Sequence, residues 1–286
     1  ECKVLGNMLE QAFKEKGKEH LSKAVAKILY GHMLTNSVSR LEKYAACAYS
    51  HFLKYGLLLQ EREDYSFETR DLGNLYHAVL DMFSKQLEKS PYSWFDFPKE
   101  WSVTVIEEAV SSCAGEYGNS ILYASERNMY VINRMKRILV RTVEALQHQL
   151  THGKFNPQEF ELSFSSLSDL SAVSVQLSEK EKMLLRGRID RVDVNETEDK
   201  VYVKVIDYKS DDKEFDLVSV YYGLSLQLVV YMNAAMEYEK KKHPDKTVVP
   251  AALLYYKVSD PYVQREKEDT PEDIDTRIRE QLAMTG

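Results

Sequence analysis

The chain has 286 residues, of which 44% are hydrophobic and 29% are charged, and its net charge is −7. This is the composition of an ordinary globular protein, and the acidic balance excludes a surface that is basic all over, although not a local basic groove. No apolar run approaches the roughly 18 residues of a membrane span, and no basic-then-apolar leader opens the sequence, so we expect no membrane contact. Cys2, Cys47 and Cys113 are odd in number and widely separated, which favours reduced thiols and a cytoplasmic protein.

The first half of the chain is predicted to be mainly helical. Apolar residues recur at three- and four-residue steps in residues 37–59, where Ser37 or Ser39 is available as an N-cap. The same spacing predicts a helix over residues 71–89. Two further helices are expected, one near residues 99–113 and a long one from about 120 to 149.

Alternation with period two replaces the helical pattern after "HGKFNPQ". It predicts strands over residues 159–164, 183–194 and 200–209, with "NETED" as the turn between the last two. An amphipathic helix over about 217–242 and a β-rich run over 247–259 follow. The last residues, "IREQLAMTG", read as the inside of a helix, so we expect the chain to be a fragment.

Two carboxylates interrupt the apolar alternation of the predicted hairpin. Asp207 and Lys209 are two apart in one strand and therefore share a face. If "NETED" closes the hairpin, an odd sum of paired residue numbers places Asp190 on that face, close to Asp207. Converging carboxylates repel each other unless a cation neutralises them, and Mg²⁺ takes oxygen ligands that substrate phosphate usually completes. With a lysine to orient or deprotonate the attacking water, the pattern indicates phosphodiester hydrolysis.

Several other patterns compete for a function. On the residues alone, Asp190 and Asp207 could equally form surface ion pairs on a hairpin with one solvated face. The pair His148 and His152 has zinc-site spacing but no obvious third ligand, so a solvated helix end is favoured. The arginines of "NRMKRILVR" line one helical face, as a phosphate-tracking stripe or as an exposed charged face. No G-x-x-x-x-G-K-[ST] motif occurs, so we expect no ATP hydrolysis by this chain.

Three motifs, "GRIDRVD", "VIDYKS" and "GLSLQLVVYMNAA", resemble in order and spacing the RecB-family nuclease domains of the PD-(D/E)xK superfamily. "LGNLYHAVLD" is similar to the family's helix with a metal-binding histidine, and "FNPQEFELSF" to its glutamate-bearing strand. "SVSRLEKYAACAYSHFLKYGL" resembles the entry helix of the AddB-type nuclease domains of bacterial AddAB helicase–nucleases. The resemblance covers about residues 34–261.

The resemblance implies the fold. We expect an α/β protein with a PD-(D/E)xK restriction-endonuclease-like core, a mixed central sheet and a helical N-terminal cap. Residues 1–286 are treated as a single nuclease domain, with a mainly helical part over 1–155 and the α/β nuclease core over 156–286.

The resemblance also implies roles for the residues at matching positions. The implied ligands of Mg²⁺ or Mn²⁺ are His77, Asp190, Asp207 and the backbone carbonyl of Tyr208, with Glu161 as an outer or occasional ligand. Lys209 would serve the attacking water, and Gln227 and Tyr231 would position the lysine, the water or the DNA backbone. Without the resemblance, His77 would be read as a core or surface histidine, and Gln227 and Tyr231 as polar tips on an apolar helix.

In the family the entry helix carries a cysteine ligand of a 4Fe–4S cluster, usually followed by proline. Here Cys47 is followed by Ala48, which departs from that pattern. The other three cysteines of the family come after the nuclease core, so the cluster is expected only in the full-length protein, with Cys47 a free thiol in this chain.

The implied activity is that of a Mg²⁺-dependent DNA exonuclease domain in double-strand break repair. Its implied partners are DNA, preferably single-stranded, and an AddA-type helicase subunit in a heterodimer. Two alternatives stay open: a standalone RecB- or Cas4-like exonuclease, and a non-catalytic DNA-binding or scaffolding module with the same fold.

Overall fold

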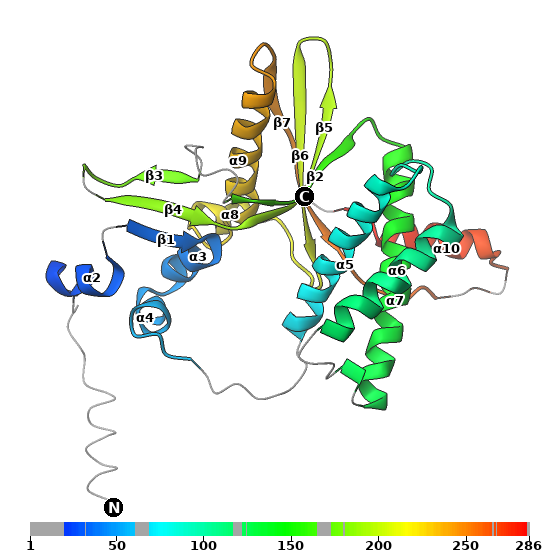
Figure 1. Ribbon diagram of the computed structural model, residues 1–286, viewed down its shortest axis with the longest axis horizontal. Coiled ribbons are helices and arrows are strands. Elements are labelled where there is room, and N and C mark those ends of the chain that lie inside the picture. The colour runs from blue at the N-terminus through cyan, green and yellow to red at the C-terminus, as the bar shows by residue number, and fades with distance from the viewer. Residues whose placement is uncertain are drawn as a thin grey trace, which may run out of the picture.

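The computed structural model describes residues 20–31, 33–60, 69–116, 122–123, 125–164, 173–179, 181–264, 266 and 268–284. Cys2 lies outside these residues. The described elements form a mixed α/β structure around two sheets (Figure 1). None of the helices in the described part is both long and apolar enough to cross a membrane.

The central sheet has four strands in the order β2-β5-β6-β7. Its strands are β2 Asn156–Ser163, β5 Arg188–Glu196, β6 Lys200–Lys209 and β7 Thr247–Lys257. Neighbours β2 and β5, and β5 and β6, pair antiparallel, whereas β6 and β7 pair parallel. The expectation of a mixed central sheet is therefore confirmed.

Helices cover both faces of this sheet (Figure 1). On one side lie α5 Thr69–Lys89, α6 Lys99–Glu116 and α7 Glu126–Thr151, and on the other lies α9 Gln227–Lys242. Alternate residues of β6 pack on opposite sides of the sheet, because successive side chains of a strand point to opposite faces. Ile206 joins the core of α5, α6 and α7, whereas Val203 and Val205 join the core that includes α9.

A smaller sheet lies beside the central one, in the order β1-β4-β3. Its strands are β1 Met33–Ser37, β3 Ser174–Gln176 and β4 Lys182–Arg186, and β1 runs parallel to β4. The short helices of this region are α2 Lys23–Tyr30, α3 Val38–Ala46 and α4 Ala48–His51, followed by a π-helical turn, Phe52–Gly56. A strand and its sheet therefore occur within the half of the chain that was expected to be mainly helical.

Backbone breaks divide three elements that the sequence predicted as continuous. The helix over 37–59 is interrupted at Cys47, which is extended (φ −163°, ψ 106°). The strand over 183–194 breaks at Gly187, so that β4 and β5 enter different sheets. The helix over 217–242 is divided into α8 Leu217–Tyr221 and α9, with Gly223 between them at φ +75°, a conformation that only glycine adopts at little cost.

Two predicted helix boundaries also differ from the structure. The long helix expected from about residue 120 begins at Glu126, where the side chain of Ser125 caps it by accepting a hydrogen bond from the Asn128 amide. The last helix, α10 Pro271–Gln281, ends at a C-cap on Leu282 rather than running through to the end of the chain.

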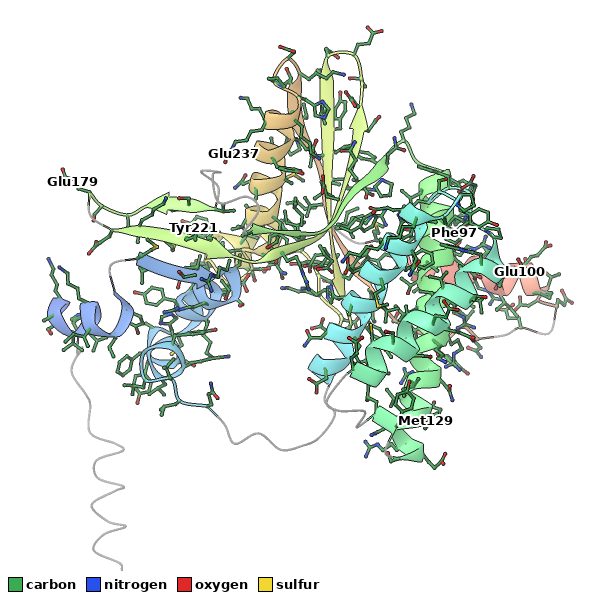
Figure 2. The ribbon with its side chains drawn as sticks, in the orientation of Figure 1. Phe97, Glu100, Met129, Glu179, Tyr221 and Glu237 are labelled. Atoms are coloured by element: carbon green, nitrogen blue, oxygen red, sulfur yellow. The ribbon has the colours of Figure 1, made fainter. Side chains whose placement is uncertain are left out.

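The β5–β6 hairpin is buried on both faces. Arg191 and Asp193 are each fully buried, and the guanidinium donates from Nε at 2.5 Å and from Nη2 at 2.9 Å to the carboxylate. The Arg191 guanidinium lies 5.3 Å from the centre of the Trp94 ring, in cation–π contact. In Figure 2, Phe97 lies among the helices on one side of the central sheet, whereas Glu179 lies at the tip of the β3–β4 connection on the other side. The alternative of a hairpin with one solvated face is therefore wrong.

Replacing Arg191 with methionine is expected to destabilise the fold by about 3 kcal/mol, because it removes one of the two cations that compensate the buried Asp193 carboxylate. Lys204, whose Nζ lies 2.8 Å from the same carboxylate, still offsets part of its charge and so limits the loss of stability. Chemical denaturation measures the change, with the exposed Arg127→Met on α7 as the matched control. Equal stability of the two variants would contradict the expectation.

Candidate metal centre and active site

Three ligand-bearing side chains meet where α5, β2 and β5 approach one another. Nδ1 of His77 on α5 lies 3.3 Å from Oδ1 of Asp190 on β5 and 3.7 Å from Oε1 of Glu161 on β2. One potential ligand atom from each residue lies within 4.8 Å of the other two. A nitrogen and two carboxylate oxygens at this spacing can hold one divalent cation.

The strand register explains why Glu161 and Asp190 meet. In the antiparallel β2–β5 pair, Phe160 is opposite Arg191 and Leu162 is opposite Ile189, so Glu161 falls opposite Asp190. Glu161 also has a φ of +50°, in the left-handed region that side chains other than glycine rarely adopt. Such a conformation costs of order 1–3 kcal/mol and occurs mostly at functional sites. Glu161, expected only as an outer or occasional ligand, lies within the three-residue cluster.

Asp190 and Asp207 share one face of the hairpin. Arg191 pairs with Ile206 and Val192 with Val205, an odd sum that places Asp190 opposite Asp207. The register on which the sequence prediction depended is therefore confirmed. Both side chains are nearly inaccessible, with relative exposures of 7% and 1%. Burial, and next the charge of Asp190, raise the pKa of Asp207 to about 7.

A polar network joins Asp207 to the lysine and to α9. Lys209 Nζ lies 2.6 Å from Oδ2 of Asp207 and donates to Oε1 of Gln227 at 3.1 Å. Nε2 of Gln227 donates to Oδ1 of Asp207 at 2.8 Å and to the Tyr231 hydroxyl at 3.0 Å. Gln227 and Tyr231 are four apart on α9, so both reach the same end of β6. The four residues therefore act as one unit.

Charge in this network fixes the protonation of Lys209. Burial opposes its positive charge, but the Asp207 carboxylate outweighs burial and raises the pKa of Lys209 above its usual value. Lys209 is therefore a cation at neutral pH. Burial also raises the pKa of Tyr231, which stays a neutral hydroxyl.

His77 is held in its charged form in the same way. Burial lowers the pKa of the imidazole, yet hydrogen bonds to the carboxylates of Asp190 and Glu161 raise it to about 10. A proton thus occupies the place where a cation would bind, since a metal ligand must be the neutral imidazole.

Tyr208 contributes its backbone to this region. Its amide donates to Oδ2 of Asp190 at 2.7 Å, which fixes that carboxylate, and its ring lies edge-on to the ring of His77. A cavity of about 190 Å³ opens here, and His77, Tyr208 and Lys209 are among the residues that line it. The cavity is large enough to hold solvent next to His77.

A family model, that of the PD-(D/E)XK nuclease superfamily, matches residues 35–285. The chain belongs to this superfamily. PD-(D/E)XK nucleases are typically metal-dependent. The resemblance drawn from the three sequence motifs is confirmed.

Curated relatives of this PD-(D/E)XK chain are named as subunits of an ATP-dependent helicase/deoxyribonuclease. The protein of Lachnoclostridium phytofermentans is 42% identical over 282 residues, which is 99% of this chain and 23% of that protein. Those of Caldanaerobacter subterraneus subsp. tengcongensis and Clostridium tetani are 40% and 38% identical, over 91% and 90% of this chain and 22% of each relative. The chain thus spans less than a quarter of the length of these relatives.

Arg188 is a residue of this PD-(D/E)XK site that the sequence reasoning missed. Its guanidinium forms an ion pair with Oε2 of Glu161, while Oε1 of Glu161 faces His77. Arg188 precedes Asp190 by two residues in β5, so the period-two pattern already placed both on one face. The two-residue spacing from Asp190 was therefore the sequence signal that could have placed Arg188 in the site.

Cys47 lies away from this cluster. It is exposed, ends α3 and begins α4, and its Sγ accepts a hydrogen bond from the Ser50 amide at 3.4 Å. The other described cysteine, Cys113, is on α6 with its Sγ 3.3 Å from Sδ of Met82. The described residues therefore do not supply the four thiolates of an iron–sulfur cluster.

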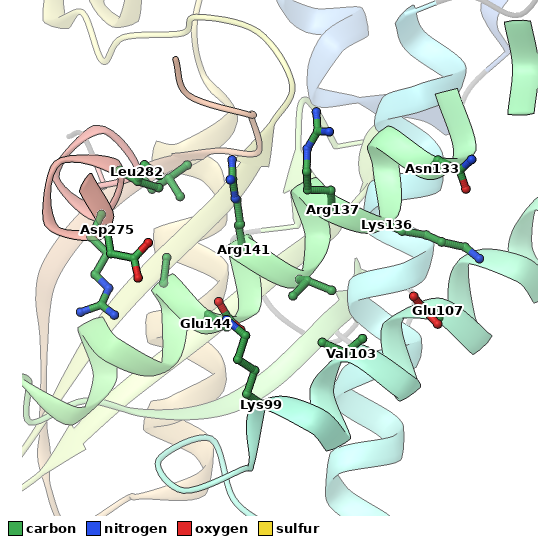
Figure 3. A pocket seen from close by; sticks show the side chains of 14 residues that line it. Lys99, Val103, Glu107, Asn133, Lys136, Arg137, Arg141, Glu144, Asp275 and Leu282 are labelled. Atoms are coloured by element: carbon green, nitrogen blue, oxygen red, sulfur yellow. The ribbon is translucent and has the colours of Figure 1, made fainter. Parts of the chain in front are cut away.

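The basic stripe on α7 is partly neutralised. Arg137 and Arg141 both bind Asp260, the latter from Nη1 to Oδ1 at 2.6 Å, and both line a cavity of about 460 Å³ beside α10 (Figure 3). Arg134 is exposed and does not line this cavity. Two of the three arginines thus form a tertiary contact, so at these positions α7 is neither a free phosphate-tracking stripe nor simply an exposed charged face.

The histidine pair at the end of α7 is a stacked pair. The rings of His148 and His152 lie 4.2 Å apart, and Nδ1 of His152 is 2.8 Å from the backbone oxygen of His148. Within the described part of the chain, no third His, Cys or carboxylate forms a ligand cluster with them.

Proposed function

We propose that this chain is a deoxyribonuclease domain that hydrolyses phosphodiester bonds of a DNA strand in a reaction that depends on Mg²⁺ or Mn²⁺. The observation that carries the proposal is the junction of two groups at one end of β5 and β6. His77, Glu161 and Asp190 form a cation-binding set, and Asp207 links it to the Lys209 and Gln227 network.

The donor set fits a divalent cation. Two buried carboxylates face each other across the hairpin; burial, and next the charge of Asp190, raise the pKa of Asp207, and a bound cation would offset both effects. His77, Asp190 and Asp207, with Glu161 as an additional ligand, would hold the ion, and we keep the backbone carbonyl of Tyr208 in the proposed set. When bound, the ion would act as a Lewis acid at the scissile phosphate and lower the pKa of the attacking water.

Lys209 acts in its charged form in this proposal. As an ammonium group it donates hydrogen bonds that orient the attacking water and offset the charge that develops on the phosphate oxygens. Gln227 keeps the ammonium group and the Asp207 carboxylate in fixed relation, since it contacts both. Tyr231 fixes the amide of Gln227 in turn.

The names of the relatives suggest a substrate and a partner for this domain. They are called helicase/deoxyribonuclease subunits, so we propose that this domain works beside an AddA-type helicase subunit and cuts one unwound strand during double-strand break repair. In that setting Cys47 would be one ligand of an iron–sulfur cluster. We also propose that residues 1–286 act as one nuclease domain.

A cleavage assay tests the proposal. The purified chain is incubated with labelled single-stranded or duplex DNA in Mg²⁺, in Mn²⁺ or in EDTA. We expect metal-dependent cleavage of the single strand, weak cleavage of the duplex, and binding that weakens steeply with salt. DNA binding without cleavage in either metal would favour the scaffolding alternative, and efficient processing of duplex ends would favour a standalone exonuclease.

Cation binding is expected to release protons. The imidazole of His77, with a pKa of about 10, must lose its proton to become a ligand, so the affinity should rise about tenfold per pH unit from pH 7 to 9 and level off above about pH 10. Below pH 7 the partly protonated Asp207 makes the dependence steeper. Calorimetric titration with Mn²⁺ in buffers of different ionisation enthalpy counts the protons.

The control for this titration is His77→Gln, which should bind Mn²⁺ more weakly and with a flatter pH dependence above pH 7. An affinity for Mn²⁺ in the unchanged protein that is constant from pH 7 to 9 would contradict the raised pKa of His77, and an unchanged Mn²⁺ affinity in His77→Gln would remove His77 from the ligand set.

A further inference from the structure

The first turn of α9 is capped by a side chain from a distant part of the sequence, that of Glu42. Oε1 of Glu42, on α3, accepts hydrogen bonds from the backbone amides of Leu226 at 2.7 Å and Gln227 at 3.2 Å. Leu226 is the N-cap residue of α9, and its own side chain cannot accept a hydrogen bond. A carboxylate at this place satisfies two free helix amides and interacts favourably with the helix dipole.

The contact around Glu42 is close-fitting. Gly223, in the bend before α9, has a φ of +75°, and a Cβ atom built on it would lie 3.2 Å from the Cβ of Ala45. Ala45 is three residues after Glu42 on α3, so both face the α8–α9 bend. Leu41 and Leu226 also pack against the same hydrophobic core. The contact between α3 and the start of α9 thus has polar and apolar parts.

Gln227, whose backbone amide donates to Glu42, also organises the polar network. The side chain of Gln227 contacts Asp207, Lys209 and Tyr231, and its place is set by the first turn of α9. A small displacement of that turn would lengthen all three hydrogen bonds together. For a catalytic arrangement, a misplacement of about 1 Å can cost about 10²-fold in rate.

We propose that Glu42 is a positioning residue that acts through Gln227: it anchors the start of α9 and so fixes the amide that orders Lys209 and Asp207. The inference rests on the proposed nuclease function and deepens it, because it makes α3, the helix that ends at Cys47, part of the support of the site. A displacement of α3 is then transmitted to the lysine through one carboxylate.

The test is a double-mutant cycle with Glu42→Ala, Gln227→Ala and the double variant, assayed on single-stranded DNA with Mn²⁺. We expect Glu42→Ala to lower kcat about tenfold with KM for DNA unchanged, and to have less than about a twofold effect once Gln227 is alanine. Glu42→Gln should recover most of the rate, since its amide oxygen still accepts from both backbone amides. Glu108→Ala, on the exposed face of α6, is the matched control.

Multiplicative effects of the two alanine substitutions, or a normal kcat in Glu42→Ala, would overturn the inference. If the unchanged protein cleaves no DNA, the proposed function fails, and the positioning role is read separately from the side-chain NH₂ signals of Gln227 in an NMR spectrum. Glu42→Ala should then shift these signals toward those of a solvated amide, whereas Glu42→Gln and Glu108→Ala should leave them in place. Unshifted signals in Glu42→Ala would contradict the positioning role by itself.

Discussion

Replacing Asp190 with asparagine is expected to abolish detectable cation binding and to lower the cleavage rate about 10³-fold, the size of effect that corresponds to the roughly 4 kcal/mol supplied by an acting metal ion. The substitution removes a carboxylate that contacts His77 and faces Asp207, yet the amide oxygen can still accept the 2.7 Å hydrogen bond from the Tyr208 amide. The local backbone should therefore survive the loss of charge.

Thermal unfolding separates this result from misfolding. In the unchanged protein, a non-cleaving cation such as Ca²⁺ at about 100 times its Kd should stabilise the fold by about 2.7 kcal/mol. Asp190→Asn should unfold near the metal-free midpoint of the unchanged protein and gain nothing from Ca²⁺. It loses the ion pair with His77, but it also removes the charge that, after burial, contributes most to the raised pKa of Asp207.

The matched control is Asp199→Asn, a carboxylate in the exposed turn of the same hairpin. It should keep both the activity and the stabilisation by Ca²⁺. An Asp190→Asn protein that cleaves within about tenfold of normal and is still stabilised would show that Asp190 is not a ligand.

Replacing Lys209 with alanine is the second large effect, with an expected loss of about 10²-fold in cleavage and little change in DNA binding. The ammonium group lies 2.6 Å from Asp207 and is only 20% exposed, so it is poorly placed to contribute much to general phosphate attraction. Without it, Asp207 loses a neighbouring cation and its pKa should rise further. Single-turnover cleavage and a binding titration in Ca²⁺ measure the two quantities.

Two further variants sharpen this test. Lys200→Ala makes the same substitution at the other end of β6 and should behave as the unchanged protein. Lys209→Arg keeps the charge but cannot donate a proton to or accept one from the water at neutral pH. Partial activity of the arginine variant supports a cationic role, whereas inactivity equal to that of Lys209→Ala favours proton transfer. Full activity of Lys209→Ala would remove the lysine from the mechanism.

The hairpin was predictable because its determinants are local. Period-two alternation predicts the two strands and restricts the register to two parities, of which only an odd sum brings Asp190 to Asp207. The structure has that odd sum, because Asn195 and Glu196 extend β5 and shorten the expected turn. His77 and Glu161 are different. Nothing in their own segments indicates that α5 and β2 approach β5 at those positions, and only the family resemblance placed them in the site.

Contacts between distant segments were not predictable. Glu42 reads as one more charged residue on a short helix, and its partners are backbone amides, which leave no signature in the sequence. The break at Gly223 was missed for a related reason. An isolated glycine in an amphipathic pattern is tolerated in many helices, and its sequence context shows neither the left-handed backbone at Gly223 nor the close approach of Ala45. The roles assigned to the site residues stay predictions until the variants are assayed.

The parallel pairing of β1 with β4 sets an order of assembly for a chain that emerges from the ribosome. Met33 lies opposite Lys182, and parallel, long-range pairings are slow to form because the loop entropy is lost before the contacts compensate for it. Residues 33–37 therefore have no strand partner until β4 has been synthesised, and Glu42 has no helix to cap until Leu226 has been added. The central hairpin can fold before then, since β5 and β6 are adjacent in sequence. The cationic network around Lys209 is thus completed late, and a nascent domain stalled before α9 would already display its two aspartates without the arrangement needed to use them.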